Sequence, residues 1–525
     1  MQTQSGVLGP IDGPELFIGL VGAVGTNLRL LVDTLSEELH EVSYETHEIR
    51  LSGLLRGIPQ FKSLVDLEGG PEEVRIDSHM NAGDKLRRDM QSGAALALLS
   101  AIAIQDYRQE RSSGTDTAIA RQVYILNSLK HPEEANTLRR IYGRAFCLIS
   151  LYAPRAERVD SLSETIARSH HGFDKDKFRN EAEKLIEKDA GSGEGEYGQS
   201  VQDVFPLADF FLRSAERADM KREVKRFVEL LFNHPFHTPT RDEYGLYIAR
   251  AVALRSADLS RQVGAAIANE DGDILAVGCN EVPRPGGGAV WPGEPGDYRD
   301  FRVGTDKSAT MKREIVAEVL KRLSDANWLR EDKERLPVNK LVDDALAGEE
   351  SLLENARISN IIEFGRIVHA EMSALMDAVR RGISVKNSTL FCTTFPCHMC
   401  ARHLISAGIE RVVYIEPYPK SMTKELYRRA VRVDEDMADQ NAVIFDSFVG
   451  VSPRRYADLF EMPKRKDGRG AALEWSRTKA NPKIDQYTTT YIELEKTTRV
   501  YLWDHRAEFG LSEEEALQSE GGTIA

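Results

Sequence analysis

The sequence predicts an α/β protein with two domains and a C-terminal extension. The chain has 525 residues, which is too long for a single hydrophobic core. In residues 1–235, apolar strands alternate with amphipathic helices, a pattern typical of a mostly parallel sheet. Residues 241–470 instead show a hairpin that is followed by helix, strand, helix and strand. We expect the remaining residues, 471–525, to pack on the second domain.

The first domain begins with a strand, a glycine turn and a helix. The apolar run at 16–21 predicts a buried strand, and the apolar residues of 26–39 recur at helical spacing. The turn between them has the layout of a loop that binds phosphate through backbone N–H groups and a helix N-terminus. We therefore predict that Gly22, Gly25 and Thr26 bind a nucleotide.

The same turn departs from the full phosphate-loop pattern. That pattern, G-x-x-x-x-G-K-[ST], requires a lysine where this sequence has Thr26 and Asn27. The later strand at 122–128 also lacks an acidic residue that could hold magnesium. Three interpretations stay open: a degenerate P-loop kinase-like domain that still binds a nucleotide, a glycine turn that only permits packing, and an active kinase. We favour the first, which makes residues 1–235 an inactive regulatory domain.

Composition and charge narrow the class of protein. A net charge of −14 argues against broad nucleic-acid binding, which depends on Lys and Arg contacts to phosphate, although it leaves room for a local basic patch. No apolar run approaches the roughly 20 residues of a membrane span, and the first residues lack the features of a signal peptide. Five scattered cysteines do not form a disulfide framework. We expect a cytoplasmic protein that does not bind a membrane.

The second domain is predicted from short, regularly ordered elements. Two strands flank Asp271-Gly272, a dipeptide that favours a hairpin. A Gly- and Pro-rich loop and charged helical sequence follow, and we interpret about 286–360 as an insertion. After it, the predicted elements are a helix at 369–383, a strand at 389–394, a helix that begins at 397 and a strand at 411–416.

Two motifs in this domain predict a zinc site that activates water. His369 and Glu371 form H-x-E, and Cys397 and Cys400 lie in P-C-H-M-C. A catalytic zinc takes three protein ligands and keeps one position for water. This pair of motifs is typical of zinc-dependent nucleobase deaminases. We predict that His369, Cys397 and Cys400 bind Zn²⁺, and that Glu371 moves protons instead of binding the metal.

The chemistry of such a site also suggests substrate contacts. Zinc lowers the pKa of water from about 15.7 to near 7, so hydroxide can attack C4 of cytosine or C6 of adenine. Glu371 would carry the water proton to the ring and then to the leaving ammonia. Thr394 and Phe395 precede Pro396, where a backbone carbonyl could hold the exocyclic amine. Ala370 lies between the two residues of H-x-E and is a further predicted substrate contact.

Residues 247–420 resemble the dCMP deaminase family. The segments that carry the resemblance are 255–267, 278–280, 369–375 and 393–421. The second domain is thereby expected to have a cytidine-deaminase-like α/β/α fold. Its pairing with a degenerate kinase-like half resembles the two-domain bacterial anti-phage deoxycytidylate deaminases, which the segments GLVGAVGTNL, YILNSLKHPEE and LYAPRAER also fit.

The resemblance implies a function and further site residues. It implies deamination of dCTP, dCMP or both to dUTP and dUMP, which would deplete deoxycytidine nucleotides during phage infection. It places Asn280 on the sugar, and Lys420 and Ser421 near the phosphates. It further implies a homo-oligomer and a regulatory nucleotide, either dCTP and dTTP or a purine nucleotide. It leaves room for an inhibitory RNA or protein partner, although no residue points to one.

Two alternatives to this function stay open. A nucleic-acid base deaminase, such as a tRNA adenosine deaminase, would carry the same two zinc motifs, although the acidic net charge and the nucleotide-family segment at 255–280 weigh against it. A non-catalytic nucleotide sensor would use both domains for binding alone. The presence of Glu371 weighs against this second alternative because binding alone does not require a proton carrier.

Overall fold

The computed structural model of the chain describes residues 12–505, except for 66–69, 113, 115, 191–194, 215, 348–351, 354–355, 362–363, 419–420, 434–440, 463 and 485–489. The chain forms two compact units. One consists of Met1–Glu243 and Val449–Ala525, and the other consists of Tyr244–Phe448. None of the helices in the described residues is both long enough and apolar enough to cross a membrane.

The first unit is built on a six-stranded sheet. Its strands are β1 (Leu16–Gly22), β2 (Glu45–Arg50), β3 (Gln122–Asn127), β4 (Phe146–Tyr152), β5 (Phe210–Arg213) and β12 (Gly450–Val451). They lie in the order β12-β5-β4-β1-β3-β2, and only β12 pairs in an antiparallel direction. All seven residues of β1 are buried, as a central parallel strand requires. The predicted mostly parallel sheet is confirmed.

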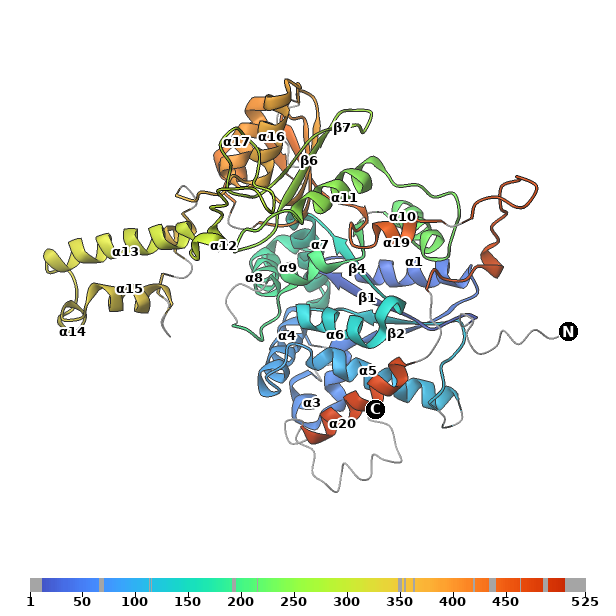
Figure 1. The fold of residues 1–525 in the computed structure, drawn as a ribbon. Coiled ribbons are helices and arrows are strands. Elements are labelled where there is room, and N and C mark those ends of the chain that lie inside the picture. Colours follow the sequence, from blue (N-terminus) through green and yellow to red (C-terminus); the bar gives the residue numbers. More distant parts are fainter. Residues whose placement is uncertain are drawn as a thin grey trace. The chain divides into compact units, whose positions relative to one another are not determined.

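Helices cover this sheet, and several begin with a side-chain cap. They are α1 (Leu28–His40), α2 (Leu51–Leu54), α3 (Pro59–Val65), α4 (Glu72–Asp89), α5 (Ala95–Arg111), α6 (Pro132–Tyr142), α7 (Arg155–Ser169), α8 (Arg179–Asp189), α9 (Val201–Val204), α10 (Arg217–Leu231), α19 (Tyr456–Phe460) and α20 (Tyr491–Asp504). Asn27 caps α1 by accepting a bond from the Leu30 N–H, and His131 and Glu134 form a capping box at α6. Helices α1 and α10 pack against each other (Figure 1).

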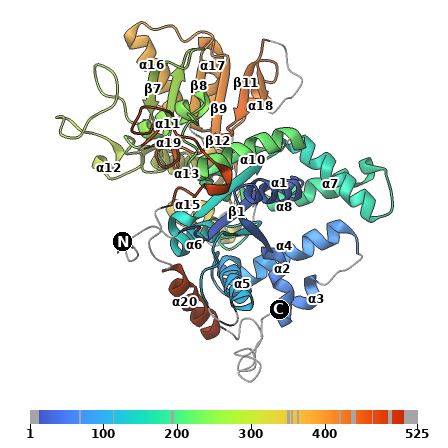
Figure 2. The same ribbon diagram turned by 90° about the vertical axis from the view of Figure 1, so that its right-hand side faces the viewer.

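The described part of the C-terminal segment packs on the first unit, so our expectation that 471–525 packs on the second domain was wrong for these residues. Helix α20 lies beside α5 (Figure 2), and Tyr491, Ile492 and Leu502 join the hydrophobic core of this unit. The physical reason is the burial of these apolar side chains, and buried polar contacts accompany it. Arg108 of α5 contacts Glu495 of α20, and the side chains of both residues are completely buried.

The second unit also contains a six-stranded sheet. Its strands are β6 (Gly264–Ala268), β7 (Ile274–Cys279), β8 (Thr389–Thr394), β9 (Arg411–Glu416), β10 (Val431–Val433) and β11 (Val443–Ser447). They lie in the order β10-β11-β9-β8-β6-β7. The β6–β7 hairpin is antiparallel, and the pairs β8–β9, β9–β11 and β10–β11 are parallel. The predicted hairpin and the two strands that follow it are confirmed.

Helices and a helical insertion complete the second unit. The helices of this part of the chain are α11 (Arg241–Ala253), α12 (Asp300–Val303), α13 (Lys307–Asp325), α14 (Glu331–Glu334), α15 (Val338–Leu346), α16 (Ala370–Arg381), α17 (His398–Ala407) and α18 (Thr423–Leu426). Helices α13 and α15 of the predicted insertion pack against each other (Figure 1). Helices α16 and α17 bury Leu375, Ala401 and Leu404 in the core of the sheet. This packing fixes where both helices begin.

Candidate active site

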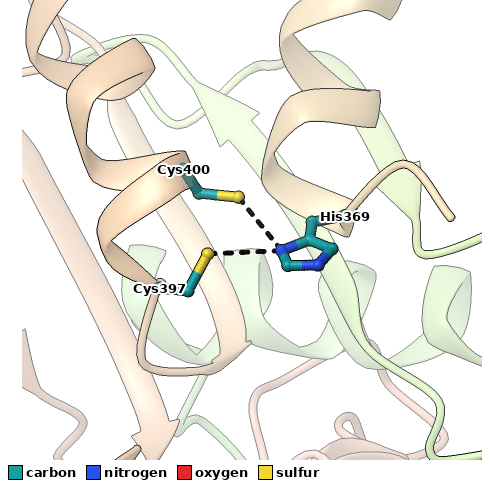
Figure 3. A group of neighbouring side chains, drawn as sticks. All are labelled: His369, Cys397 and Cys400. Carbon is teal, nitrogen blue, oxygen red and sulfur yellow. Dashed lines mark hydrogen bonds between the residues drawn. The ribbon is translucent and has the colours of Figure 1, made fainter. Parts of the chain in front are cut away.

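The three predicted zinc ligands lie at the starts of two neighbouring helices. His369 is the N-cap residue of α16, and Cys397 is the N-cap residue of α17. The Nδ1 atom of His369 is 3.3 Å from Sγ of Cys397 and 3.4 Å from Sγ of Cys400. Figure 3 shows the imidazole facing both sulfurs across the gap between the helices. The structure therefore brings His369 together with residues that lie 28 and 31 positions away in the sequence.

A glycine of β7 lets α16 approach the sheet closely enough for this arrangement. A Cβ atom at Gly278 would lie 2.3 Å from the Ala374 backbone nitrogen and 2.4 Å from the Ala370 carbonyl oxygen. Both atoms belong to the first turns of α16, so neither can move without moving the helix. The position of His369 and Glu371 thus depends on the missing side chain at Gly278.

Hydrogen bonds within the site shift the pKa values of the three predicted ligands. A hydrogen bond from Cys400 and a further one from His369 lower the pKa of Cys397 to about 4. The hydrogen bond to Cys397 raises the pKa of His369 to about 9, against the opposing effect of burial. The bond to Cys397 and burial raise the pKa of Cys400. The lowered pKa of Cys397 favours the thiolate that metal binding requires, and a metal ion would displace the remaining protons.

The donor set fits zinc. Two sulfurs and one imidazole nitrogen all lie within 4.8 Å of one another. Thiolate and imidazole are the preferred ligands of Zn²⁺, and three protein ligands leave one position for water. Thiolates at a helix N-terminus are further stabilised by the backbone dipoles, which suits the start of α17. The described part of the chain contains two groups of possible metal ligands, and this group is the one that includes cysteine.

Glu371 lies in the same cavity and is buried. Burial raises the pKa of this carboxyl group, and the negative charge of Cys397 raises it further. A raised pKa makes the ionised carboxylate a stronger base, which favours proton uptake from a neighbouring water. The position of Glu371 in the first turn of α16 is thus suited to proton transfer beside the metal ligands.

The cavity has a volume of about 170 Å³, which is small compared with the roughly 300–1,000 Å³ of sites for drug-sized ligands. Five of the residues that were predicted to be catalytic or to contact the substrate line this cavity. The lining residues are Asp258, Ser260, Arg261, Val263, Asn280, His369, Ala370, Glu371, Thr394, Phe395, Cys397 and Tyr418. The ring of Phe395 is fixed by an edge contact with Tyr414 at 4.8 Å between ring centroids. The cavity suits one small planar ring.

Asn280 lines the cavity, but its amide group is used within the protein. Its Oδ1 accepts a bond of 2.7 Å from the Val263 N–H, and its Nδ2 donates to Asp258 Oδ2 at 2.7 Å and to the Arg261 carbonyl at 2.8 Å. Both amide protons are therefore engaged. In this state Asn280 positions the 258–263 segment, and its predicted bond to a sugar would require exchange of one of these partners.

Lys420 and Ser421 are the two residues predicted near the phosphates. Ser421 Oγ donates to the Pro396 carbonyl at 2.9 Å, so this side chain supports the turn that precedes Cys397. Ser421 does not belong to the cavity lining. Lys420 lies outside the described residues.

Sequence reasoning missed five lining residues: Asp258, Ser260, Arg261, Val263 and Tyr418. The Arg261 side chain is 48% exposed, and one of its guanidinium nitrogens lies 3.7 Å from Glu416 Oε2. The guanidinium carbon lies 5.4 Å from the centre of the Tyr418 ring. The segment at 255–267 carried the family resemblance, but no local pattern marked Arg261 as a cavity residue.

The glycine turn of the first unit is occupied by a carboxylate of the protein itself. The Val24 N–H donates to Asp189 Oδ2 at 2.6 Å, and Lys130 Nζ donates to Asp189 Oδ1 at 2.8 Å. Lys130 Nζ also donates to the Gly22 carbonyl at 3.0 Å. Asp189 is completely buried. A negative charge from the end of α8 thus lies on the turn where a phosphate was predicted.

Packing explains the residues of this turn without a ligand. The φ angle of Gly25 is +89°, and a Cβ there would lie 2.5 Å from the Arg158 carbonyl oxygen. Thr26 Oγ1 donates to the Ala23 carbonyl at 2.8 Å. Nucleotide binding by Gly22, Gly25 and Thr26 stays a prediction, as does the kinase-like nature of this unit.

The site combines a His/Cys/Cys metal-ligand group with a buried glutamate, which is the combination of the zinc-dependent nucleobase deaminases. Residues 239–416 match the family described as the cytidine and deoxycytidylate deaminase zinc-binding region. This match confirms Zn²⁺ as the predicted cofactor. The individual ligands and the role of Glu371 stay predictions that the geometry supports.

Comparisons with known proteins agree with this match. The chain is 39% identical over 54 residues to the deoxycytidylate deaminase of Enterobacteria phage T2, which covers 10% of this chain and 29% of the relative. It is 24% identical over 192 residues to a probable deoxycytidylate deaminase of Drosophila melanogaster, covering 37% of this chain and 66% of the relative. The chain thus spans less than a third of the length of its phage relative.

A solved structure is also similar to part of the chain. It is the dCMP deaminase from the cyanophage S-TIM5 in complex with dCMP and dUMP. The match has 19% sequence identity and covers 41% of this chain and all of the phage chain, with a TM-score of 0.22.

Proposed function

We propose that the chain is a hydrolytic, zinc-dependent deaminase of deoxycytidine nucleotides, which converts dCMP, dCTP or both to the corresponding deoxyuridine nucleotides. One observation carries the proposal: His369 and Cys397 line a small cavity together with the buried Glu371, and Cys400 lies within reach of the same metal position. The relatives named deoxycytidylate deaminase support cytosine as the base.

The protein's own groups divide the work of the reaction. Bound zinc would supply Lewis acidity, which lowers the pKa of water to near 7. Glu371 accepts a proton from the attacking water and delivers it to N3 of the cytosine ring. It then carries a second proton to the leaving amine, so that water and cytosine give uracil and ammonia. Phe395 and Ala370 form apolar walls that hold the ring in place and keep other water out.

The mouth of the cavity suits a phosphate. Among the described residues that line the cavity, Arg261 is the one with a permanently charged basic side chain. Its guanidinium group is half-exposed and faces solvent. A base that reaches the zinc ligands must leave its sugar and phosphate toward this mouth. Arginine binds phosphate through two parallel N–H groups, so Arg261 would distinguish a nucleotide from a nucleoside.

The family resemblance suggests a biological setting for this reaction. We propose that the enzyme lowers the deoxycytidine nucleotide pool in anti-phage defence, and that it acts in the cytoplasm as a homo-oligomer. The first unit would then control the second in response to a nucleotide. A phosphate could bind the glycine turn only after it had displaced the Asp189 carboxylate, so control by a nucleotide would depend on this exchange.

The proposal is tested by measuring ammonia release from dCMP, dCTP, deoxycytidine and tRNA. We expect release from at least one deoxycytidine nucleotide. The Glu371→Ala variant should lose this activity while it retains zinc, which separates proton transfer from metal binding. Activity on tRNA alone would instead support the nucleic-acid deaminase, and nucleotide binding without ammonia release would support the sensor.

A further inference from the structure

A second group of possible metal ligands lies in the described part of the first unit. His234 and His237 follow α10, and Glu229 lies in the last turns of that helix. One ligand atom of each residue lies within 4.8 Å of the other two. His237 Nε2 is 2.7 Å from Glu229 Oε2, and the two imidazole ring centroids are 4.4 Å apart. None of these residues takes part in the proposed deaminase chemistry.

We propose that Glu229, His234 and His237 form a second metal site, which binds a divalent cation of the Zn²⁺ type and fastens the segment after α10 to that helix. Two imidazoles and one carboxylate are a common ligand set for zinc, with water in the fourth position. The site is independent of the proposed deaminase activity. Its role would be structural, because the metal would join helix α10 to the irregular segment that follows it.

The carboxylate is held in the orientation that a metal ligand needs. Arg477 Nη2 donates to Glu229 Oε1 at 2.8 Å, and the other oxygen, Oε2, faces the histidine ring. Ligating carboxylates are usually hydrogen-bonded in this way through their second oxygen. The charge of Arg477 is shared with Glu38, whose Oε2 lies 3.1 Å from Nη1.

The histidine segment is also fixed from outside. The Trp475 indole N–H donates to the Phe232 carbonyl at 3.0 Å, and Arg465 Nε donates to the Pro235 carbonyl at 3.0 Å. The Trp475 ring packs edge-on against His234, with 4.9 Å between ring centroids. These contacts hold the backbone on both sides of His234, so the imidazoles need little rearrangement to bind a metal.

Metal binding has an identifiable cost in hydrogen bonds. The metal would replace the proton that His237 Nε2 shares with Glu229. His234 Nδ1 accepts a bond of 3.3 Å from the Phe236 N–H, which is long and therefore weak.

Metal content per chain tests the site in the full-length protein. After saturation with zinc and removal of the excess, we expect about two zinc ions in the parent chain and about one in the His234→Ala/His237→Ala variant. With cobalt in place of zinc, the thiolate charge-transfer band of the cysteine site should persist in this variant. The deaminase activity should persist as well. Equal metal content in the parent and the variant would overturn the proposal.

Two further variants sharpen the assignment. Cys397→Ser/Cys400→Ser should retain about one cobalt ion without the thiolate band, because only nitrogen and oxygen ligands remain. His170→Ala is a matched control, since His170 forms a similar 2.7 Å contact with Glu73 but lies outside the group of ligands. Its metal content should equal that of the parent. Loss of all metal from the cysteine variant, with the parent retaining one ion, would contradict a second site.

Discussion

Arg108 Nη1 lies 2.7 Å from Glu495 Oε2, although the two residues are 387 positions apart in the sequence. Arg108 also contacts Glu15 at 3.0 Å, and all three side chains are completely buried. One guanidinium group thus serves two buried carboxylates. Tyr491 Oη donates to Glu15 at 2.8 Å, so α20 contributes two residues to this buried network.

The stability of the α20 contact should fall as pH rises. Burial raises the pKa of Glu495 to about 7, against the opposing effect of Arg108, from an ordinary value of 4.5. The folded state therefore binds this proton more tightly than the unfolded state does. Its contribution, about 3 kcal/mol at most, is fully present below pH 4.5 and is lost as pH rises through about 7.

Urea unfolding between pH 5 and pH 8, roughly the range of this titration, measures the effect. The Glu495→Gln variant should flatten the pH dependence because its side chain cannot ionise. Glu493→Gln is the matched control: this residue lies on the same helix, and its side chain is 74% exposed. It should keep the parent slope. A parent slope of the opposite sign over this range would contradict the assignment to Glu495.

The carboxylate on the glycine turn should be a strong determinant of stability. Asp189→Ala would leave the Lys130 ammonium and the Val24 N–H without their buried acceptor. Removing one partner of a buried ion pair costs about 3–5 kcal/mol. We expect a loss of this size in urea unfolding of the full chain. Asp189→Asn keeps an acceptor for Val24 and should lose less, whereas equal stability of all three proteins would show that the ion pair contributes nothing.

The sequence predicted best what depends on neighbouring positions. His369, Glu371, Cys397 and Cys400 were identifiable because each motif is short and its chemistry requires those residue types. The strands were predicted for a similar reason, since a run such as 16–21 is apolar throughout and has a fully buried counterpart in β1.

What the sequence could not show depends on distant partners. Glu495 of α20 contacts Arg108, which in turn contacts Glu15. No local pattern in the sequence connects these three residues, so the position of α20 could not be predicted. The turn at Gly22 to Thr26 resembled a phosphate site because the carboxylate that occupies it comes from position 189. Asn280 could be recognised as a site residue, but its three internal hydrogen bonds appear only when the 258–263 segment is folded beside it.

The close approach of β7 and α16 should be essential for activity. In Gly278→Ala, the added methyl group would lie within 2.3 Å of the Ala374 nitrogen and push the start of α16 away from the sheet. A misplacement of about 1 Å at a catalytic group can cost roughly 10²-fold in rate. We expect a loss of deaminase activity of this order, together with weaker zinc retention. Gly468→Ala is the control, because nothing lies within 4 Å of its Cβ position.

Arg261 should determine whether the enzyme prefers a nucleotide to a nucleoside. Arg261→Ala removes the guanidinium group at the cavity mouth, where the phosphate of a bound nucleotide would lie. A hydrogen bond to a charged group contributes about 1.5–3 kcal/mol, so kcat/KM for dCMP should fall roughly 10- to 100-fold, mainly through KM. Activity on deoxycytidine should stay within about twofold of the parent, because the zinc ligands and Glu371 are unchanged. Arg402→Ala, on the exposed face of α17 and outside the cavity lining, should leave both activities unchanged. An equal loss on dCMP and deoxycytidine would show that Arg261 supports the fold of the site and does not bind the phosphate.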